Sequence, residues 1–327
     1  MATNPATDAY KFLKLSPNPD GSVTRLASPP TSPACPDPIS PDSVRSKDVP
    51  LDPAKGTFIR IFLPPGTPSD AKLPIIVYFH GGGFVLFSAT STMFHDSCSR
   101  MAHTVPALVL SVEYRLAPEH RLPAAYEDAV DALHWLRKQA TAGGDEWVKE
   151  HGDFSRCFLM GSSAGGNITY YTGLCALEMD LCPIQIKGLI MNQTFFGGIE
   201  WTDSELRLAN DRIISQPASE LLWSLALPEG ADRGHKYCHP FTPGLAEHEK
   251  VKRLPRCLVR GYTGDPLSDR QKQLAKMLSN LGAEVVSEFN EGGFHGIELF
   301  DPVQAQSLME LIKAFVNGGD GVIKSTM

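Results

Sequence analysis

The order of apolar runs along the chain constrains the fold more than any other feature of the sequence. Short apolar runs, several of them continuous, alternate with segments of helical periodicity over roughly 250 residues. Continuous apolar runs are typical of strands covered on both faces, and strand–helix alternation favours parallel pairing. The sequence therefore predicts an α/β fold, a mostly parallel central sheet flanked by helices. The predicted strands are Phe58–Leu63, Leu73–Phe79, Ala107–Tyr114, Cys157–Gly161, Lys187–Asn192, Cys257–Gly261 and Ala283–Phe289, and the predicted helices are Ala124–Gln139, Ala164–Asp180, Asp269–Leu281 and Pro302–Phe315.

Two segments depart from this alternation. Residues 1 to about 50 contain ten prolines, which is typical of a disordered tail. Residues 9–15 nevertheless have apolar side chains at helical spacing, so a short helix folded over an apolar surface is an equal alternative. From about 201 to 242 the chain runs through polar turns and one short amphipathic helix over Ser219–Leu225. Insertions at the carboxyl edge of such a sheet are where lids lie, which makes this segment a candidate lid.

Composition limits the classes of function. A chain of 327 residues with 42% hydrophobic residues can bury a full core, as one large domain or two smaller ones. Its 37 acidic and 30 basic residues give a net charge of −7, which argues against nucleic-acid and anionic-membrane partners. The seven cysteines show no Cys-x-x-Cys spacing, so free thiols and no metal site are expected. Without a leader pattern or a long apolar run, we expect a cytoplasmic protein.

A glycine-rich turn supplies a candidate nucleophile. Gly161-Ser162-Ser163-Ala164-Gly165 directly follows the apolar run Cys157–Met160 and opens a predicted helix. In a sharp strand-to-helix turn the central serine has strained dihedral angles, and small neighbours leave its hydroxyl exposed. The flanking glycines place Ser163, not Ser162, at the centre. The motif alone is weak, because a glycine-rich turn without chemistry has the same pattern.

A second glycine run supplies candidate oxyanion donors. His80-Gly81-Gly82-Gly83-Phe84 directly follows the apolar run Leu73–Phe79, about eighty residues before the serine turn. Consecutive glycines let the backbone approach a ligand with two free N–H groups. A phosphate site is the alternative, but the run lacks the lysine of a P-loop and no helical pattern follows at once. The N–H groups of Gly82, Gly83 and Ala164 are the predicted oxyanion hole.

A serine nucleophile needs a histidine base, and the histidine needs a carboxylate. His295 lies in a tight glycine loop after the strand that ends at Phe289, which predicts a position at the carboxyl edge of the sheet. For the acid, Asp265 follows the strand Cys257–Gly261 in a loop, whereas Asp269 begins a predicted helix, where acidic residues ordinarily act as caps. We therefore predict Asp265 as the acid and His295 as the base.

With these residues in place, the chain resembles a plant carboxylesterase of the hormone-sensitive-lipase-like group of α/β-hydrolases. The resemblance implies the triad Ser163, Asp265 and His295, no metal and no organic cofactor. It also implies one α/β-hydrolase domain over 1–327, with cap elements at approximately 1–45 and 201–242. One departure is that Ser162 stands where the group commonly has an acidic residue. The motifs that carry the resemblance are His80–Phe84, Tyr114–Glu119, Leu122–Asp128, Gly161–Asn167, Gly264–Pro266 and Gly293–His295.

The resemblance favours hydrolysis of a small-molecule ester. The related gibberellin receptors lack the catalytic histidine, and the dehydratase and cyclase members often change an oxyanion glycine or the serine; this chain keeps all of these residues. An aromatic-rich pocket suits a small acyl group such as acetyl on an apolar alcohol, as in specialised metabolites, hormone conjugates and xenobiotics. The resemblance allows a monomer or a homodimer. The candidate pocket residues, each of which has packing in the core as an equal alternative, are Phe84, Phe87, Phe195, Phe196, Leu222 and Trp223.

Overall fold

The computed structural model describes residues 5–141 and 143–318, so the first four residues of the predicted N-terminal cap segment and the last nine of the predicted domain lie outside the described residues. Within these ranges the main sheet has eight strands in the order β10-β9-β8-β7-β5-β6-β4-β3. The strands of this sheet are β3 (Arg45–Asp52), β4 (Thr57–Leu63), β5 (Leu73–Phe79), β6 (Leu108–Glu113), β7 (Gly152–Ser162), β8 (Ile186–Asn192), β9 (Arg256–Tyr262) and β10 (Val285–Asn290).

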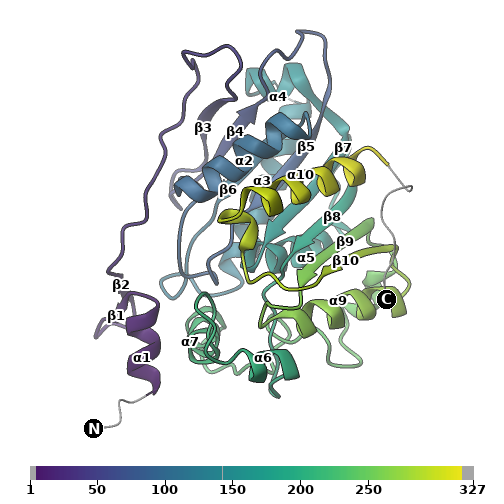
Figure 1. Cartoon of the computed structure of the whole chain (residues 1–327). Coiled ribbons are helices and arrows are strands. Elements are labelled where there is room, and N and C mark those ends of the chain that lie inside the picture. Colours follow the sequence, from purple (N-terminus) through teal and green to yellow (C-terminus); the bar gives the residue numbers. More distant parts are fainter. Residues whose placement is uncertain (1–4, 142, 319–327) are drawn as a thin grey trace.

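The pairing of the strands decides where the loops meet. β4 runs antiparallel to both of its neighbours, β3 and β6. Every other neighbouring pair is parallel, so the carboxyl ends of β5 to β10 lie at one edge of the sheet. The predicted mostly parallel sheet is confirmed, and its carboxyl edge faces downward in Figure 1. The antiparallel edge strand β3 was not predicted, because a proline and four charged residues interrupt its apolar pattern.

Helices cover both faces of the sheet, which explains the continuous apolar runs. Along β5, Ile75 and Val77 face one apolar cluster while Ile76 and Tyr78 face the other. All four side chains are buried. The first cluster packs beneath α3 (Ala124–Thr141), α5 (Ala164–Ala176) and α9 (Ser268–Asn280), and the second beneath α2 (Thr92–Thr104) and α10 (Pro302–Val316).

The N-terminal segment is folded and contacts the insertion between β8 and β9. It forms the helix α1 (Pro5–Phe12), followed by a hairpin of β1 (Leu15–Pro17) and β2 (Val23–Arg25). Of the two alternatives for this segment, the structure thus has the helix. α1 packs against α7 (Gln216–Ala226), and both lie below the carboxyl edge of the sheet in Figure 1. The remaining short helices are α4 (Glu146–His151), α6 (Asp203–Arg207), α8 (His248–Val251) and the 3-10 turn η1 (Ile297–Leu299).

Candidate active site

Ser163 lies at the turn between β7 and α5 in a strained backbone conformation, with φ 56° and ψ −120°. Its N–H donates to the carbonyl of Asn192, and its own carbonyl accepts from the N–H of Phe195, both at 2.9 Å. The flanking glycines are required by packing. A Cβ at Gly165 would lie 1.9 Å from the carbonyl oxygen of Phe79, so no larger residue fits there without moving the strand. The sequence therefore fixes the turn sterically, and main-chain hydrogen bonds hold the strained serine.

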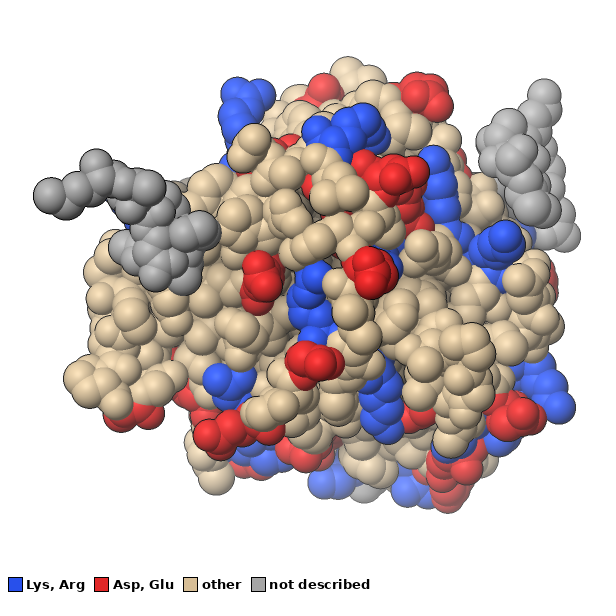
Figure 2. All heavy atoms as spheres, turned by 90° about the horizontal axis from the view of Figure 1, so that it is seen from below, with Lys and Arg blue, Asp and Glu red and all other residues tan. Residues whose placement is uncertain are grey.

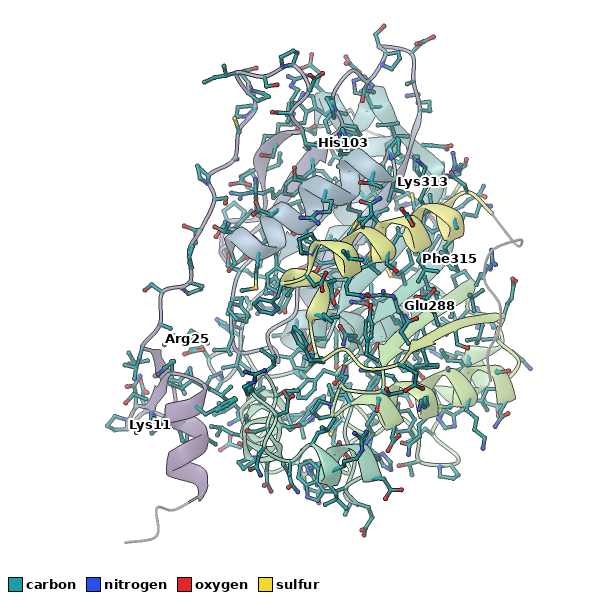
Figure 3. The ribbon with its side chains drawn as sticks, viewed as in Figure 1. Lys11, Arg25, His103, Glu288, Lys313 and Phe315 are labelled. Carbon is teal, nitrogen blue, oxygen red and sulfur yellow. The ribbon has the colours of Figure 1, made fainter. Side chains whose placement is uncertain are left out.

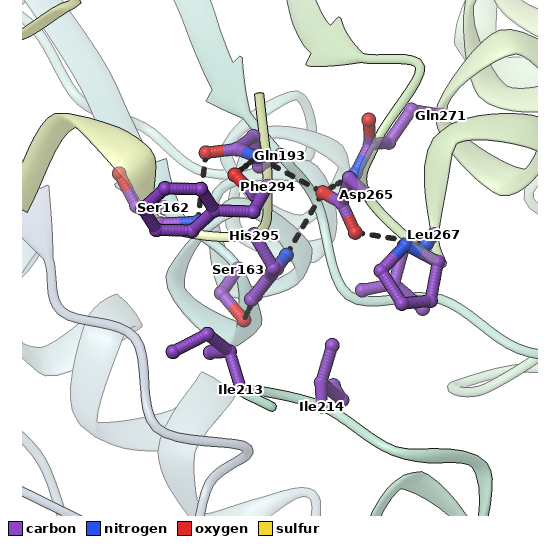
Figure 4. Close-up of polar contacts among 12 residues, drawn as sticks. Ser162, Ser163, Gln193, Ile213, Ile214, Asp265, Leu267, Gln271, Phe294 and His295 are labelled. Atoms are coloured by element: carbon purple, nitrogen blue, oxygen red, sulfur yellow. Dashed lines mark hydrogen bonds and ion pairs between the residues drawn. The ribbon is translucent and has the colours of Figure 1, made fainter. Parts of the chain in front are cut away.

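The structure brings the three predicted triad residues into one hydrogen-bonded chain (Figure 4). The Oγ of Ser163 lies 2.9 Å from Nε2 of His295, and Nδ1 of His295 lies 2.9 Å from Oδ2 of Asp265. Asp269, the alternative acid, lies in the first turn of α9 and accepts a hydrogen bond from the N–H of Ser204 in α6. Because the partner of Nδ1 is the carboxylate of Asp265, which can only accept, Nδ1 carries the proton. Nε2 is then free to accept a proton from the hydroxyl of Ser163.

Asp265 is fully buried, and four donors reach its two oxygens. Oδ2 accepts from the imidazole of His295, from Nε2 of Gln193 at 3.0 Å and from Nε2 of Gln271 at 2.8 Å. Oδ1 accepts from the N–H of Leu267 at 2.9 Å. A buried carboxylate is costly unless such bonds replace its water, so this set of donors is what keeps a charged acid inside the protein.

The surroundings of His295 raise its pKa above the ordinary 6.5. Burial acts to lower the pKa, but attraction to the Asp265 carboxylate and the hydrogen bond to it act in the opposite direction and prevail. The carboxyl groups of Glu298 and Asp211 add smaller raising effects. A base of raised pKa accepts a proton more readily, so this imidazole is prepared for the proton of the serine hydroxyl.

The glycine run lies directly against the serine turn. A Cβ on Gly81 would be 3.2 Å from Cβ of Ser163. Gly82 and Gly83 have φ values of +119° and +61°, a region that favours glycine. Within the part of the chain that the structure describes, the N–H groups of Gly82, Gly83 and Ala164 donate no hydrogen bond to the protein. Gly82 and Gly83 line the same cavity as Ser163, and Ala164 follows Ser163 in the chain. Free N–H donors at such a place are what a developing oxyanion requires.

His80 supports this loop and has no exposed nitrogen. Its side chain is fully buried and stacked on Tyr114, with ring centroids 4.3 Å apart. Nδ1–H of His80 donates to the carbonyl of Gly81 at 2.7 Å, and the hydroxyl of Tyr114 donates to the carbonyl of His80 at 2.9 Å. Burial lowers the pKa of His80 to about 4. The ring is therefore neutral at ordinary pH and acts as packing for the loop.

The N-terminal segment is tied to the same loop through Arg25, which Figure 3 labels beside α1. Nε of Arg25 donates to the carbonyl of Val85 at 2.7 Å, and Nη2 donates to the carbonyl of Ala117 at 2.9 Å. Nη2 also forms an ion pair with Glu119 at 2.8 Å. Arg25 thereby links β2 to the chain after the glycine run and to the Tyr114–Glu119 motif.

A cavity of about 410 Å³ opens at Ser163, lined by residues of the N-terminal segment, the glycine loop, the insertion and the His295 loop. Figure 2 views the molecule from the side on which α1 and α7 lie in Figure 1; uncharged residues cover much of that face, with acidic and basic side chains between them. Two of the six predicted pocket residues, Phe87 and Leu222, line this cavity. The other apolar side chains of its wall include Leu86, Met93, Phe94, Ile213 and Ile214.

The other four predicted pocket residues do not line the cavity, which corrects that expectation. Phe84, Phe195, Phe196 and Trp223 each expose 1% or less of their surface and pack in the core. Trp223 stacks on Phe195 at 4.5 Å between ring centroids, and Phe84 packs at 5.6 Å from Trp223. An aromatic residue suits a core and a pocket equally well, so its presence near a motif does not decide between them.

Two polar residues of the site were missed by sequence reasoning. Gln193 contacts Asp265 and the His295 loop. Glu298 lies in the cavity wall, where its Oε1 accepts from Nδ2 of Asn192 at 2.6 Å. The same Nδ2 donates to the hydroxyl of Ser162 at 3.1 Å. Burial raises the pKa of Glu298 above its ordinary value. An acidic residue, Glu298, thus lies near the serine turn, although Ser162 itself is not acidic. The only feature of the sequence that pointed to Glu298 is its position three residues after His295.

Two features are absent from the described residues. No group of three or more histidine, cysteine, aspartate or glutamate side chains among them is placed to hold a metal ion. None of the helices that the structure describes is both long enough and apolar enough to cross a membrane.

Comparison with known proteins gives consistent results. The model of a family described as having the α/β-hydrolase fold matches residues 76–299. "Probable carboxylesterase 8" of Arabidopsis thaliana is 52% identical, over 96% of this chain and 95% of the relative. "3-O-acetylpapaveroxine carboxylesterase CXE1" of Papaver somniferum is 44% identical, over 94% of this chain and 97% of the relative.

Solved structures also match. An esterase of Pyrobaculum calidifontis matches with a TM-score of 0.69 and 27% identity, over 84% of each chain. A structure from a study of two fungal esterases of Rhizomucor miehei matches with a TM-score of 0.72 and 24% identity, over 84% of this chain and 82% of that chain, a likeness of fold alone.

Proposed function

Since this chain belongs to the plant carboxylesterases of the α/β-hydrolase fold, we propose that Ser163, His295 and Asp265 are its catalytic triad. The protein is a carboxylic ester hydrolase. The observation that carries the assignment of the triad is the continuous chain of contacts from Oγ through the imidazole to the carboxylate, with both distances at 2.9 Å. No other histidine after Ser163 in the described chain contacts its hydroxyl.

The proposed reaction has two halves. Nε2 of His295 takes the proton of Ser163 as Oγ attacks the carbonyl carbon of the ester, and Asp265 stabilises the imidazolium. The oxyanion accepts hydrogen bonds from the free N–H groups of Gly82 and Gly83 in the glycine loop and of Ala164 in the first turn of α5. The C–O bond to the alcohol then breaks, and the alcohol leaves with the proton from Nε2. Water repeats the sequence on the acyl-enzyme and releases the acid.

We infer that the substrates are esters of small acyl groups, such as acetyl, on an apolar alcohol. The wall of the cavity supports this inference because it is mainly aliphatic and aromatic near Ser163. A related protein of Papaver somniferum carries the name of a carboxylesterase of an acetylated compound, 3-O-acetylpapaveroxine, at 44% identity. The alcohol in this chain is proposed as a specialised metabolite, a hormone conjugate or a xenobiotic.

We further propose that α1 and α7 form a cap over this cavity. Leu13 and Lys14, which follow α1, lie in the wall together with Leu222 of α7. The two helices also pack against each other. A cap of this kind would keep water from the ester.

The experiment is turnover of p-nitrophenyl acetate, butyrate and octanoate and of 1-naphthyl acetate by the purified protein. Ser163→Ala and His295→Ala should each lower kcat by about 10⁴-fold or more. The exposed Ser155→Ala serves as the matched control and should keep wild-type rates. We expect acetate and butyrate to be preferred over octanoate. An inert wild type, or a Ser163→Ala variant with near-full activity, contradicts the proposed triad.

A further inference from the structure

Gln193 is bonded to both sides of the His295 loop and to the acid at once (Figure 4). Its Nε2 donates to Oδ2 of Asp265 and to the carbonyl of Phe294, each at 3.0 Å. Its Oε1 accepts from the N–H of Gly296, also at 3.0 Å. Phe294 and Gly296 are the residues immediately before and after His295. The three contacts therefore fix where the imidazole stands relative to its carboxylate partner.

The chemistry of these partners selects an amide of this length. Two of them, a carboxylate and a carbonyl, need hydrogen-bond donors, and the third, an N–H group, needs an acceptor. A primary amide supplies two N–H donors and one oxygen on the same planar group, whereas a carboxylate, an ammonium or a thioether lacks one of the two functions. Gln193 is buried, with 1% of its surface exposed, so water does not take over these contacts when the amide is lost.

The backbone of Gln193 is held in an unfavourable conformation, with φ +44°. Its N–H donates to the carbonyl of Arg260 in β9 at 2.8 Å. The carbonyl of Asn192, just before Gln193, accepts from the N–H of Ser163. The N–H of Phe195, two residues after Gln193, donates to the carbonyl of Ser163. A side-chain-bearing residue stays in the left-handed region only where its surroundings hold it there, and such positions cluster at functional sites. One short segment after β8 thus contacts the serine through its backbone and the acid and the histidine loop through one side chain.

We propose that Gln193 is a positioning residue that sets the distance and angle between His295 and its two partners in the triad. This inference rests on the proposed function, because it assigns Gln193 a part in the activation of Ser163. The effect acts through the geometry of the proposed triad, so we expect it in the rate of acyl transfer. Gln193 also borders the cavity, but with 1% of its surface exposed it offers little area to a bound alcohol. A misplacement of about 1 Å at a reacting group can cost about 100-fold in rate.

Gln193→Met tests the proposal, with Gln271→Met as the matched control. Methionine keeps the length of glutamine without its donors and acceptor. Gln271 donates to the same oxygen, Oδ2 of Asp265, but within the described part of the chain it forms no hydrogen bond with the His295 loop. We expect Gln193→Met to lower kcat for p-nitrophenyl acetate by about 10- to 100-fold with KM within about twofold. Gln271→Met should lower kcat by no more than about threefold, although both variants lose a bond to the same carboxylate. Gln193→Met also loses its bonds to Phe294 and Gly296 and should show the larger fall in Tm.

If Gln193 had only a structural role, both variants would lose Tm, and their kcat values per folded molecule would be the same. Equal losses of kcat in the two variants, or a Gln193→Met kcat within about threefold of wild type, therefore overturns the proposal. If Gln193→Met does not fold, Gln193→Glu decides instead. It keeps the shape and the acceptor for Gly296 but faces Asp265 with a carboxyl group, and it should lose at least as much activity. A Gln193→Glu variant with wild-type kcat overturns the inference equally.

A second readout separates this inference from the proposed substrate class. Paraoxon reacts with an activated serine through attack of Oγ on phosphorus and releases one p-nitrophenolate, without needing the natural ester. If the wild type is inert on carboxylic esters yet reacts with paraoxon, the proposed substrates are wrong. A slower reaction of Gln193→Met than of Gln271→Met then supports the positioning role, and equal rates overturn it. A wild type that reacts with neither reagent overturns both proposals.

Discussion

Replacing Gly83 by alanine tests the proposed oxyanion loop more sharply than removing the serine, because it leaves the triad untouched. Gly83 has φ +61°, and an added Cβ would lie 2.6 Å from Cδ1 of Leu222 in α7. Cβ atoms almost never lie this close to another heavy atom, so either the leucine side chain or the loop must shift. A shift of the loop moves the N–H of Gly83 away from the position of the oxyanion.

A control glycine isolates the cost of the backbone conformation. Gly66 has φ +63°, almost the same value, and an added Cβ there would meet nothing within 4 Å. Alanine in this region costs about 1–2 kcal/mol at either site. We therefore expect the backbone conformation alone to cost each variant about 1–3 °C of Tm in a domain of this size, with a further loss in Gly83→Ala from the contact with Leu222. Only Gly83→Ala should in addition lose an oxyanion donor, which is worth about 10²–10³ in kcat.

The assay is kcat and KM for p-nitrophenyl acetate, with Tm from thermal unfolding. Gly83→Ala should lower kcat by about 100-fold. Gly66→Ala should keep the wild-type kcat. The double variant Gly83→Ala/Leu222→Ala removes the clash and should recover about tenfold, with Leu222→Ala measured alone to complete the cycle. A Gly83→Ala kcat within about threefold of Gly66→Ala would refute the assignment of this N–H group. No recovery in the double variant would refute the steric reasoning.

Three further predictions follow from the site. Because the pKa of His295 is raised and the neutral imidazole is the base, kcat/KM should fall as pH falls, with an apparent pKa above 6.5; a midpoint below 6.5 would contradict the attraction to Asp265. Phe87→Leu should change KM because it lines the cavity, whereas Phe195→Leu should lower Tm by a few degrees with KM unaltered; the opposite pattern would reverse the placement of these rings. Burial raises the folded-state pKa of Glu298, so the folded protein loses stability as pH rises through that pKa. The Tm of Glu298→Gln minus that of the wild type should therefore be larger at pH 8 than at pH 5. An equal difference at both pH values would exclude this effect.

The sheet could be predicted, and the three residues of the proposed triad could be placed at one edge of it, because each depends on a local pattern. Apolar runs such as Leu73–Phe79 identify buried strands, and their alternation with helices indicates parallel pairing. Parallel strands bring all their carboxyl ends to one edge. Ser163, Asp265 and His295 each follow a strand, so the topology alone brings them close together. Whether they are hydrogen-bonded needed the structure.

The neighbours of the triad could not be predicted, because their roles depend on contacts between distant parts of the chain. Gln193 lies 72 residues from Asp265 and 101 residues from Phe294 in sequence. A glutamine at the end of a strand has no pattern of its own, and the left-handed φ that directs it is unusual for this residue type. Glu298 has the same difficulty, since its partner Asn192 is 106 residues away.

Strained residues fix the hydrogen-bonded edge of the sheet, whereas the apolar helices opposite it can vary. Ser163 and Gln193 both have positive φ, and buried main-chain bonds to Asn192 and Arg260 hold them there. Relaxing either residue would break such bonds away from water, which costs more than the strain releases. The sheet edge therefore presents the reacting groups in one arrangement. The elements opposite them, α1 and α7, contact the cavity mainly through apolar side chains, whose substitution changes volume and leaves no buried polar group unpaired. Changes in substrate should accordingly arise from residues such as Leu222, without altering the hydrogen-bonded groups of the sheet edge.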